Sequence, residues 1–386
     1  MTSPRLSAAA DAMPLSIFAR LYEKLAGFSG DVITLQIGDT HMGPPACSRL
    51  EKIAHTFESA GDRDIYHYGP AAGWHPLVER LAAKVAASNG LAVGASGVQI
   101  AAGATHALWC ALGAVCDPGD EILLPAPHWP LIRGIALSRN LVPVEVSSVR
   151  GAAFGDALAA KVTPKTRALY VCTPNNPDGA VLRDDELRAI AAVADRHGLW
   201  VLADEVYEDY VYDGAHRSIG ALPGMAERTI TVFSFSKGYA QAGLRVGYAA
   251  GPAAAIAAMR KMVNHTVYNV PHALQRSAHA ALDGGAEFLG AARARYRAAR
   301  DRALAMIKAP CAVPEGSTYL FLDLRSWSPG GDCQPVLERF AEAGVLLAPG
   351  VAFGSQFGAY ARLCFTAVDE ARLEDGIARI NRVLAL

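Results

Sequence analysis

The sequence predicts an α/β fold with a mostly parallel, seven-stranded sheet in a large domain and a smaller α/β domain beside it. Short apolar runs alternate with longer amphipathic segments over most of the chain, as in α/β proteins. The run at residues 199–203 shows no polar alternation, which is typical of a strand buried on both faces of a parallel sheet. The length of 386 residues suits two domains that share a ligand cleft.

The expected elements follow in chain order. Residues 1–45 are expected to form an N-terminal arm and part of the small domain, and residues 46–284 the large domain. A long helix over residues 285–307 would lead into the rest of the small domain, which together with that helix spans residues 285–386. The seven strands of the large domain are expected to begin near Val98, Glu121, Leu141, Ala168, Leu199, Thr229 and Val246.

Composition excludes several classes of function. The 36 basic and 37 acidic residues nearly cancel and basic residues do not cluster, so we expect no nucleic-acid partner. Seven cysteines without metal-ligand or disulfide spacing predict reduced thiols, a cytoplasmic protein and no metal site. Residues 100–116 form the nearest approach to a membrane span, but they contain Thr105 and His106. No continuous hydrophobic segment precedes Asp11, so neither a membrane partner nor a secretory signal is expected.

One lysine lies in a run of small residues, Ser234 to Gly247. An amine held among such residues, as Lys237 is, can form a Schiff base with an aldehyde, and Arg245 can neutralise a phosphate on the same molecule. Ser234 and Ser236 add hydroxyl groups suited to a phosphate. A lone lysine is usually a solvated surface charge, so this interpretation depends on matching signals elsewhere.

A carboxylate ends the apolar run at residues 199–203. Asp204 would lie at the carboxyl end of a parallel strand, where open α/β sheets bind their ligands. A buried carboxylate there suits a pyridinium nitrogen, because its charge keeps that nitrogen protonated. The alternative is that Asp204 caps a helix. Glu205, next in sequence, is interpreted as a structural neighbour.

A second strand end offers a phosphate cradle. The strand at residues 98–101 meets a helix expected over about 105–116, and Gly103 and Ala104 lie in the turn between them. Free N–H groups and the dipole at a helix N-terminus bind phosphate, and small residues let the backbone approach. Thr105 can add a hydroxyl donor.

Two further turns follow strands. The segment Thr173 to Gly179 is a turn signal that contains Asn176, and the Asn176–Pro177 bond is a candidate cis peptide. Trp129 follows a strand expected over residues 121–124, where its flat ring can stack on a ligand. Simple core packing of this tryptophan is the alternative.

From about Ser16 to the C-terminus, the chain resembles the class I/II (fold type I) family of pyridoxal phosphate-dependent aminotransferases. The resemblance implies pyridoxal 5'-phosphate as cofactor, with Lys237 both as its Schiff-base anchor and as the general base. It also implies that Asp204 meets the ring nitrogen and that Asn176 and Tyr207 donate to the ring oxygen. The implied catalytic residues are Lys237, Asp204 and Tyr207. The implied cofactor-binding residues are Tyr68, Gly103, Ala104, Thr105, Trp129, Asn176, Asp204, Tyr207, Ser234, Ser236, Lys237 and Arg245.

The resemblance extends to substrate binding and assembly. Arg362, in an apolar strand, would bind the substrate α-carboxylate through its guanidinium fork, with Gly38 and Asn176 beside it. Tyr68, with Tyr66 as the fallback, would reach the cofactor phosphate of a partner subunit. A symmetric homodimer with shared active sites is therefore implied.

The implied reaction moves an amino group from an L-amino acid to a 2-oxo acid by a ping-pong mechanism. A pyridoxal phosphate lyase or synthase, such as a carbon–sulfur β-lyase, uses the same cofactor residues and stays open as an alternative. A non-enzymatic binding module is a third and weaker interpretation. His265 stands where dicarboxylate-specific members have an arginine, which argues modestly against dicarboxylate donors. The donor, the acceptor and the pathway are not indicated.

Overall fold

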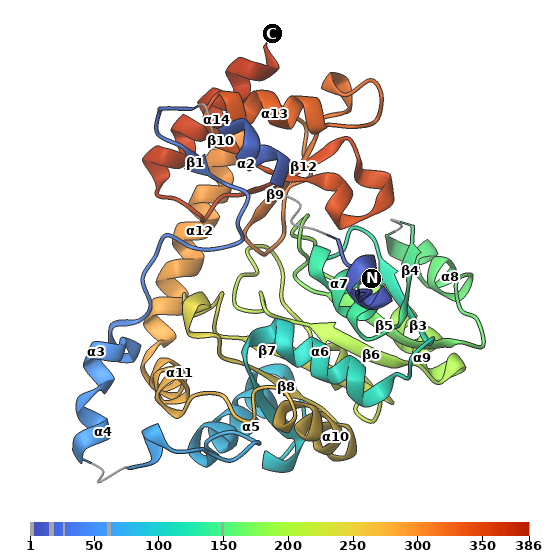
Figure 1. Cartoon of the computed structure of the whole chain (residues 1–386), viewed down its shortest axis with the longest axis vertical. Helices are drawn as coiled ribbons and strands as arrows, with labels where there is room; N and C mark the ends of the chain where they lie inside the picture. Colours follow the sequence, from blue (N-terminus) through green and yellow to red (C-terminus); the bar gives the residue numbers. More distant parts are fainter. Residues whose placement is uncertain (1–3, 15–18, 26–27, 60–62, 148–149, 386) are drawn as a thin grey trace.

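The computed structural model describes residues 4–14, 19–25, 28–59, 63–147 and 150–385. Ser16, where the family resemblance begins, lies outside the described residues. Helices were expected between most strands, and the structure places them there (Figure 1). The α-helices are α1 (Ala8–Ala12), α2 (Ala19–Leu25), α3 (Leu50–Ile53), α4 (His55–Ser59), α5 (His75–Asn89), α6 (Gly103–Val115), α7 (Pro130–Ser138), α8 (Phe154–Ala159), α9 (Asp184–His197), α10 (Ala253–Asn264), α11 (His272–Gly284), α12 (Ala286–Met306), α13 (Gln334–Glu342) and α14 (Glu370–Leu384).

A seven-stranded sheet forms the centre of the molecule, in the spatial order β2-β8-β7-β6-β5-β3-β4. The strands β3 to β7 run parallel, and β8 is antiparallel to both of its neighbours. The expected strands are confirmed, each beginning within two residues of the predicted position. Their bounds are β2 (Val98–Ala101), β3 (Glu121–Pro125), β4 (Val142–Val146), β5 (Thr166–Cys172), β6 (Trp200–Asp204), β7 (Thr229–Ser234) and β8 (Gly247–Ala250).

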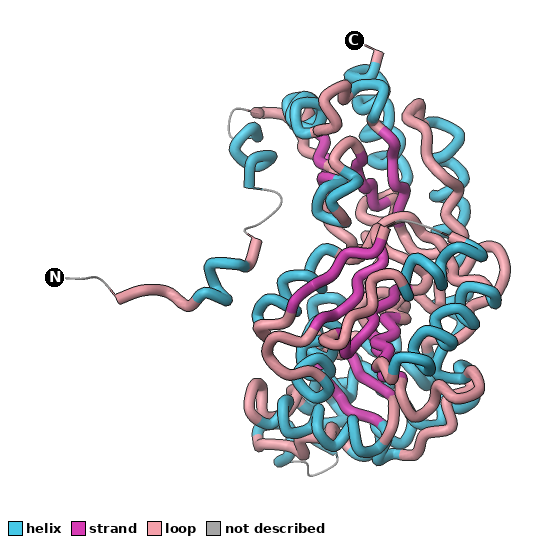
Figure 2. Tube along the Cα trace, turned by 90° about the vertical axis from the view of Figure 1, so that its right-hand side faces the viewer, coloured by secondary structure: helices cyan, strands magenta, loops and turns pink. Residues whose placement is uncertain are grey.

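Helices cover both faces of this sheet (Figure 2). Because successive strand residues point to opposite faces, Tyr170 and Leu202 pack with α6, α7 and α10, whereas Leu169 and Val201 pack with α8 and α9. A third cluster joins α5 and α11 to β2, β7 and β8. Each fully buried aliphatic side chain contributes about 1.5–3 kcal/mol, which explains why these strands are almost continuously apolar.

The C-terminal part of the chain forms a second layer of structure at the top of Figure 1. It contains the antiparallel sheet β11-β12-β9 and the parallel pair β1-β10. The long helix α12 connects it to α11, which confirms the helix expected over residues 285–307. The bounds are β1 (Ile33–Thr34), β9 (Tyr319–Asp323), β10 (Val345–Leu346), β11 (Ala348–Pro349) and β12 (Tyr360–Cys364).

The N-terminal strand β1 belongs to this second layer, because Ile33 pairs with Val345. The chain therefore leaves the second layer after β1, builds the central sheet and returns through α12. The domain boundaries after residues 45 and 284 stay a prediction. Among the described residues, no helix combines the length and the apolar character that crossing a membrane requires.

Candidate active site

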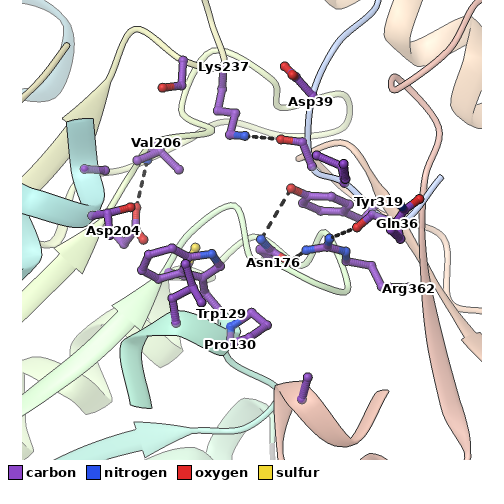
Figure 3. A pocket seen from close by; sticks show the side chains of 18 of the residues that line it. Gln36, Asp39, Trp129, Pro130, Asn176, Asp204, Val206, Lys237, Tyr319 and Arg362 are labelled. Carbon is purple, nitrogen blue, oxygen red and sulfur yellow. Dashed lines mark hydrogen bonds between the residues drawn. The ribbon is translucent and has the colours of Figure 1, made fainter. Parts of the chain in front are cut away.

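A cavity of about 1210 Å³ opens at the carboxyl ends of the parallel strands and is also lined by residues of the second layer (Figure 3). Parallel strands place their carboxyl ends at one edge of the sheet, so the loops after β3, β5, β6 and β7 all reach this cavity. Most of the predicted site residues line it: Gly38, Ala104, Thr105, Trp129, Asn176, Asp204, Tyr207, Ser234, Ser236, Lys237, Arg245 and Arg362. Gly103 lies directly behind this lining, and Tyr68 does not take part in it.

Asp204 is the last residue of β6 and is buried. Its Oδ2 accepts a hydrogen bond from the Tyr170 hydroxyl at 2.8 Å, and its Oδ1 one from the Val206 N–H at 3.4 Å. Burial raises the pKa of Asp204 to about 6, although the Tyr170 hydrogen bond lowers it. A carboxylate so poorly solvated gains strongly from a cationic partner in the cavity. The structure does not support the alternative of a helix cap, since no α-helix follows Asp204 directly.

Lys237 lies in the loop after β7, and its amine points into the cavity (Figure 3). The Nζ donates to the backbone carbonyl of Gly38 and lies 5.9 Å from the centre of the Tyr207 ring. The Tyr210 hydroxyl fixes the backbone of the loop by donating to the carbonyls of Lys237 and Gly238, at 3.1 and 3.0 Å. The amine is therefore held within the same cavity as the Asp204 carboxylate.

The phosphate cradle is built from three segments. Gly103 begins α6, and no side chain caps that helix, so its first N–H groups are free for a ligand. A Cβ on Gly103 would lie 2.6 Å from Nη2 of Arg245, so the missing side chain lets the guanidinium approach the helix start. Arg245, Ser234 and Ser236 line the same cavity as Ala104 and Thr105. These residues fit a bound phosphate.

Arg362, on β12, is 6 % exposed and forms one side of the cavity with Asn176. Its Nη1 donates to Oδ1 of Asn176 at 2.8 Å, and its Nη2 donates to the Gln36 carbonyl at 2.6 Å. Within the described residues its Nε has no hydrogen-bond partner. A buried guanidinium without a carboxylate partner is costly, and the fork geometry is suited to one. Figure 3 shows this guanidinium close to Asn176 and Tyr319.

Two aromatic residues complete the ring-binding region. Trp129 directly precedes α7, whose first residue is Pro130, and its side chain points into the cavity (Figure 3). Tyr207 is buried, and its hydroxyl lies 2.5 Å from that of Tyr319. Burial holds the pKa of Tyr207 well above its ordinary value, so its hydroxyl keeps its proton.

Tyr319, Tyr170 and Gln36 contribute to the site but were missed by the sequence interpretation. Tyr170 supports Asp204 from inside β5, and Tyr319 and Gln36 enter from the second layer. Tyr170 and Tyr319 lie within strands, and Gln36 follows β1, a strand of only two residues. The signal that found the other residues, a turn after a recognisable apolar strand, was therefore missing or weak.

Tyr68 is not brought to the cavity within one chain. It is 84 % exposed, and its ring lies 4.7 Å from that of Tyr268, while Tyr66 is 88 % exposed. Two large aromatic side chains this exposed are unusual on a free surface. Their position is compatible with contact to another subunit.

One expectation around the site was wrong. The Asn176–Pro177 peptide is not cis; the cis peptides are Thr173–Pro174, earlier in the same turn, and Ala126–Pro127, in the turn after β3. In the same turn as Asn176, Asp178 does not line the cavity, and its carboxylate accepts a hydrogen bond from Nδ2 of Asn175 at 2.9 Å. Burial raises the pKa of Asp178.

Glu205 is a structural neighbour, as expected. It is buried outside the cavity and accepts hydrogen bonds from Ser218 at 2.5 Å and from His216, whose Nε2 lies 2.8 Å away. Glu208 stands close by and pairs with Lys84. Among the described residues, Oε1 of Glu205 and Nδ1 of His216 are buried without a hydrogen-bond partner.

Comparisons with known proteins agree with this geometry. The model of the aminotransferase class I and II family matches residues 30–380. The arginine–pyruvate transaminase of Pseudomonas aeruginosa is 33% identical over 341 residues, which cover 86% of this chain and 85% of that protein. The aromatic-amino-acid aminotransferase 2 of Thermococcus litoralis is 33% identical over 379 residues, or 95% of this chain and 94% of that protein.

A solved structure extends the similarity to the fold. A double mutant of the Thermus thermophilus aspartate aminotransferase superposes with a TM-score of 0.91 at 30% identity, covering 99% of this chain and 100% of that one. The chain belongs to the class I and II aminotransferase family, with the family's fold type I architecture. It is an enzyme that carries out transamination.

Proposed function

We propose that the cavity binds pyridoxal 5'-phosphate and that the protein uses it to move an amino group from an L-amino acid to a 2-oxo acid by a ping-pong mechanism. The carrying observation is that one cavity gathers the Lys237 amine, the Asp204 carboxylate and the Gly103–Arg245 cradle. An aldehyde, a pyridine nitrogen and a phosphate are the three groups that these partners suit.

The residues present fit each part of the cofactor. Lys237 would hold its aldehyde carbon, and Asp204 its ring nitrogen, as a charge-assisted pair. The α6 N-terminus, Arg245, Ser234 and Ser236 would hold its phosphate, while Trp129 stacks on the ring. When bound, the cofactor supplies an electron-accepting ring that carries the amino group between the two substrates.

The chain's own groups then act on the substrate. The Arg362 fork binds the α-carboxylate bidentately and orients the amino acid, with Asn176 holding the guanidinium from the side. The Lys237 amine would serve as the general base that removes the α-proton, and it would then donate that proton to the carbon derived from the cofactor aldehyde. The buried position of Arg362 limits water around the carboxylate and strengthens this contact.

The lining of the cavity is mainly apolar. Ile37, Leu131 and Val351 line the cavity and are 48%, 55% and 58% exposed. Arg133 adds a guanidinium to this lining, while His265 does not line the cavity. We propose that donors with neutral, apolar side chains are preferred, because these surfaces gain from being covered.

The active unit is proposed to be a homodimer with shared sites. The support is the exposure of Tyr68 and Tyr268, whose rings contact each other at a tilt and form an aromatic surface on one chain. In this arrangement the Tyr68 hydroxyl would reach the phosphate held by the partner chain.

The test is the near-ultraviolet and visible spectrum of the protein loaded with pyridoxal phosphate, recorded as single L-amino acids are added without an oxo acid. We expect a preferred donor to convert the visible band completely at one equivalent per site and to yield its 2-oxo acid. Catalytic release of ammonia with no change of the band would favour the lyase alternative. Absence of any cofactor band would contradict the proposal.

A further inference from the structure

Tyr319, the first residue of β9, lies at the centre of the site without having an assigned role. It is 1 % exposed, and Figure 3 shows its hydroxyl directed between Asn176 and the Lys237 side of the cavity. The hydroxyl oxygen lies 2.5 Å from the Tyr207 hydroxyl and 3.5 Å from Nδ2 of Asn176. A buried hydroxyl with two polar neighbours on the reacting side of a cavity is costly to keep unless its hydrogen bonds are used.

The ring of Tyr319 also contacts Arg362, the residue proposed to bind the substrate carboxylate. The Arg362 guanidinium lies 4.3 Å from the centre of the Tyr319 ring and 5.0 Å from that of Phe353. The Tyr207 ring meets the Tyr319 ring edge-on at 5.7 Å. The guanidinium is therefore positioned by cation–π contact, and the ring that positions it carries a hydroxyl that reaches Tyr207.

Counting donors fixes the direction of the hydrogen bond between Asn176 and Tyr319. Arg362 Nη1 donates to Oδ1 of Asn176, so that oxygen is the acceptor and Nδ2 of Asn176 is a donor. Nδ2 therefore donates to the Tyr319 oxygen. Either hydroxyl can donate in the Tyr207–Tyr319 contact; Tyr319 is taken as the donor here, because the Tyr207 hydrogen is then available to a ligand in the cavity.

The backbone leaves room for this arrangement. A Cβ at position 38 would overlap the Tyr319 hydroxyl, so the glycine there allows the hydroxyl to lie against the chain. The same short loop accepts from Arg362 through the Gln36 carbonyl and from Lys237 through the Gly38 carbonyl. The loop, Arg362 and Tyr319 thus form one packed unit.

We propose that Tyr319 is a positioning residue that couples the substrate-carboxylate pair, Arg362 and Asn176, to the Tyr207 hydroxyl through a one-directional chain of hydrogen bonds. These hydrogen bonds run from Asn176 to Tyr319 and from Tyr319 to Tyr207, which in turn donates to the ring oxygen of the cofactor. Each donor in such a chain polarises the next, so Tyr207 becomes a stronger donor than an isolated tyrosine. The inference rests on the proposed binding of pyridoxal phosphate.

The test uses Tyr319→Phe in the cofactor-loaded enzyme, because phenylalanine keeps the ring beside Arg362 and removes only the hydroxyl. A weaker donor at Tyr207 stabilises the anionic ring oxygen less. The midpoint of the pH-dependent change in the visible band is therefore expected to move to higher pH. We also expect kcat to fall about three- to tenfold, as one lost hydrogen bond allows, while KM for amino donors changes less than threefold.

Tyr360→Phe is the matched control, since its hydroxyl contacts Asp323 and does not line the cavity.

A double-variant comparison separates positioning from simple packing. In a Tyr207→Phe background, Tyr319→Phe should cause no further shift of the spectral midpoint, because its effect passes through the Tyr207 oxygen. An unchanged spectral midpoint in Tyr319→Phe would overturn the inference. The inference would also fail if Tyr319→Phe shifted the midpoint equally in the wild-type and in the Tyr207→Phe background. If the wild-type protein binds no cofactor, the proposed function itself fails; a normal wild-type band beside an unshifted variant rejects only the role of Tyr319.

Discussion

Nη2 of Arg245 lies where the side chain of residue 103 would otherwise be: a Cβ on Gly103 would come within 2.6 Å of it. The two residues are far apart in the sequence, and the contact brings a guanidinium to the free N–H groups at the start of α6. Gly103 also has a φ of 83°, which favours glycine. The phosphate cradle thus depends on the lack of a side chain at Gly103 as much as on the charge of Arg245.

Gly103→Ala is expected to weaken pyridoxal phosphate binding at least tenfold, because the new Cβ displaces Arg245 and strains the backbone. The dissociation constant is measured by titrating cofactor-free protein with the cofactor. Gly113→Ala is a matched control in the same helix: its Cβ would also lie 2.6 Å from an arginine Nη2, that of Arg139, away from the cavity. Equal losses in both variants would contradict a specific cradle.

Arg362→Lys should raise KM for amino acids about ten- to a hundredfold while affecting kcat less. Lysine keeps the charge but loses the fork, and one strong charge-assisted contact is worth about 1.5–3 kcal/mol. Steady-state kinetics with one donor and one oxo acid measure the split. Arg325→Lys serves as the control, since Arg325 is exposed and pairs with Asp323. A lower kcat at constant KM would exclude Arg362 as the carboxylate partner.

Asp204→Asn should change how the stability of the cofactor-free protein depends on pH. The pKa of Asp204 is raised by burial from 3.8 to about 6, so the folded state binds the proton more strongly than the unfolded state. The free energy of unfolding contributed by Asp204 therefore falls as pH rises from 3.8 to about 6, by up to about 1.4 kcal/mol per pH unit.

The asparagine variant cannot titrate and should lack this fall. Urea unfolding at several pH values between about 4 and 7, the window in which a carboxyl with such a shift titrates, compares the two proteins. Substitution of the exposed Asp195 by asparagine should leave the wild-type pH dependence in place. Parallel curves for wild type and Asp204→Asn would show that the carboxyl is not destabilised by burial.

The predicted role of Tyr68 can be tested by mixing subunits. Tyr68→Ala and Lys237→Ala homodimers are each expected to have little activity. In a hybrid dimer, one site combines an intact Lys237 with an intact Tyr68 from the other chain, so activity should return after the two are unfolded and refolded together. A mixture no more active than the sum of its parts would argue against a shared site.

The sequence was sufficient for much of the site because many of its residues follow strand ends or begin helices. Asp204, Asn176 and Lys237 lie at the ends of apolar strands or in the loops that follow them, and these strands can be recognised from the local sequence alone. Parallel strands then bring such ends together whatever their order in the sequence. For the same reason, the seven strands could be predicted nearly to the residue.

The remaining features depend on tertiary contacts. Tyr319 is one tyrosine among apolar strand residues, and only the approach of the second layer to β6 and the Asn176 turn reveals its contact with Tyr207. Tyr170 looks like an ordinary core residue until Asp204 is placed beside it. The predicted cis bond at Asn176–Pro177 was wrong, and the cis bond in this turn is Thr173–Pro174. Local sequence favours cis isomers only weakly, so it does not distinguish between two prolines in one turn.

The central claim is that Lys237 carries the cofactor, and reduction of the loaded protein with borohydride tests it most directly. Reduction makes an amine–aldehyde linkage permanent, and peptide mass mapping then locates the modified lysine. The account predicts one modified residue per chain, Lys237, and a Lys237→Ala protein that still binds some cofactor but carries no such label and has no turnover. A label on another lysine, with none on Lys237, would contradict the account.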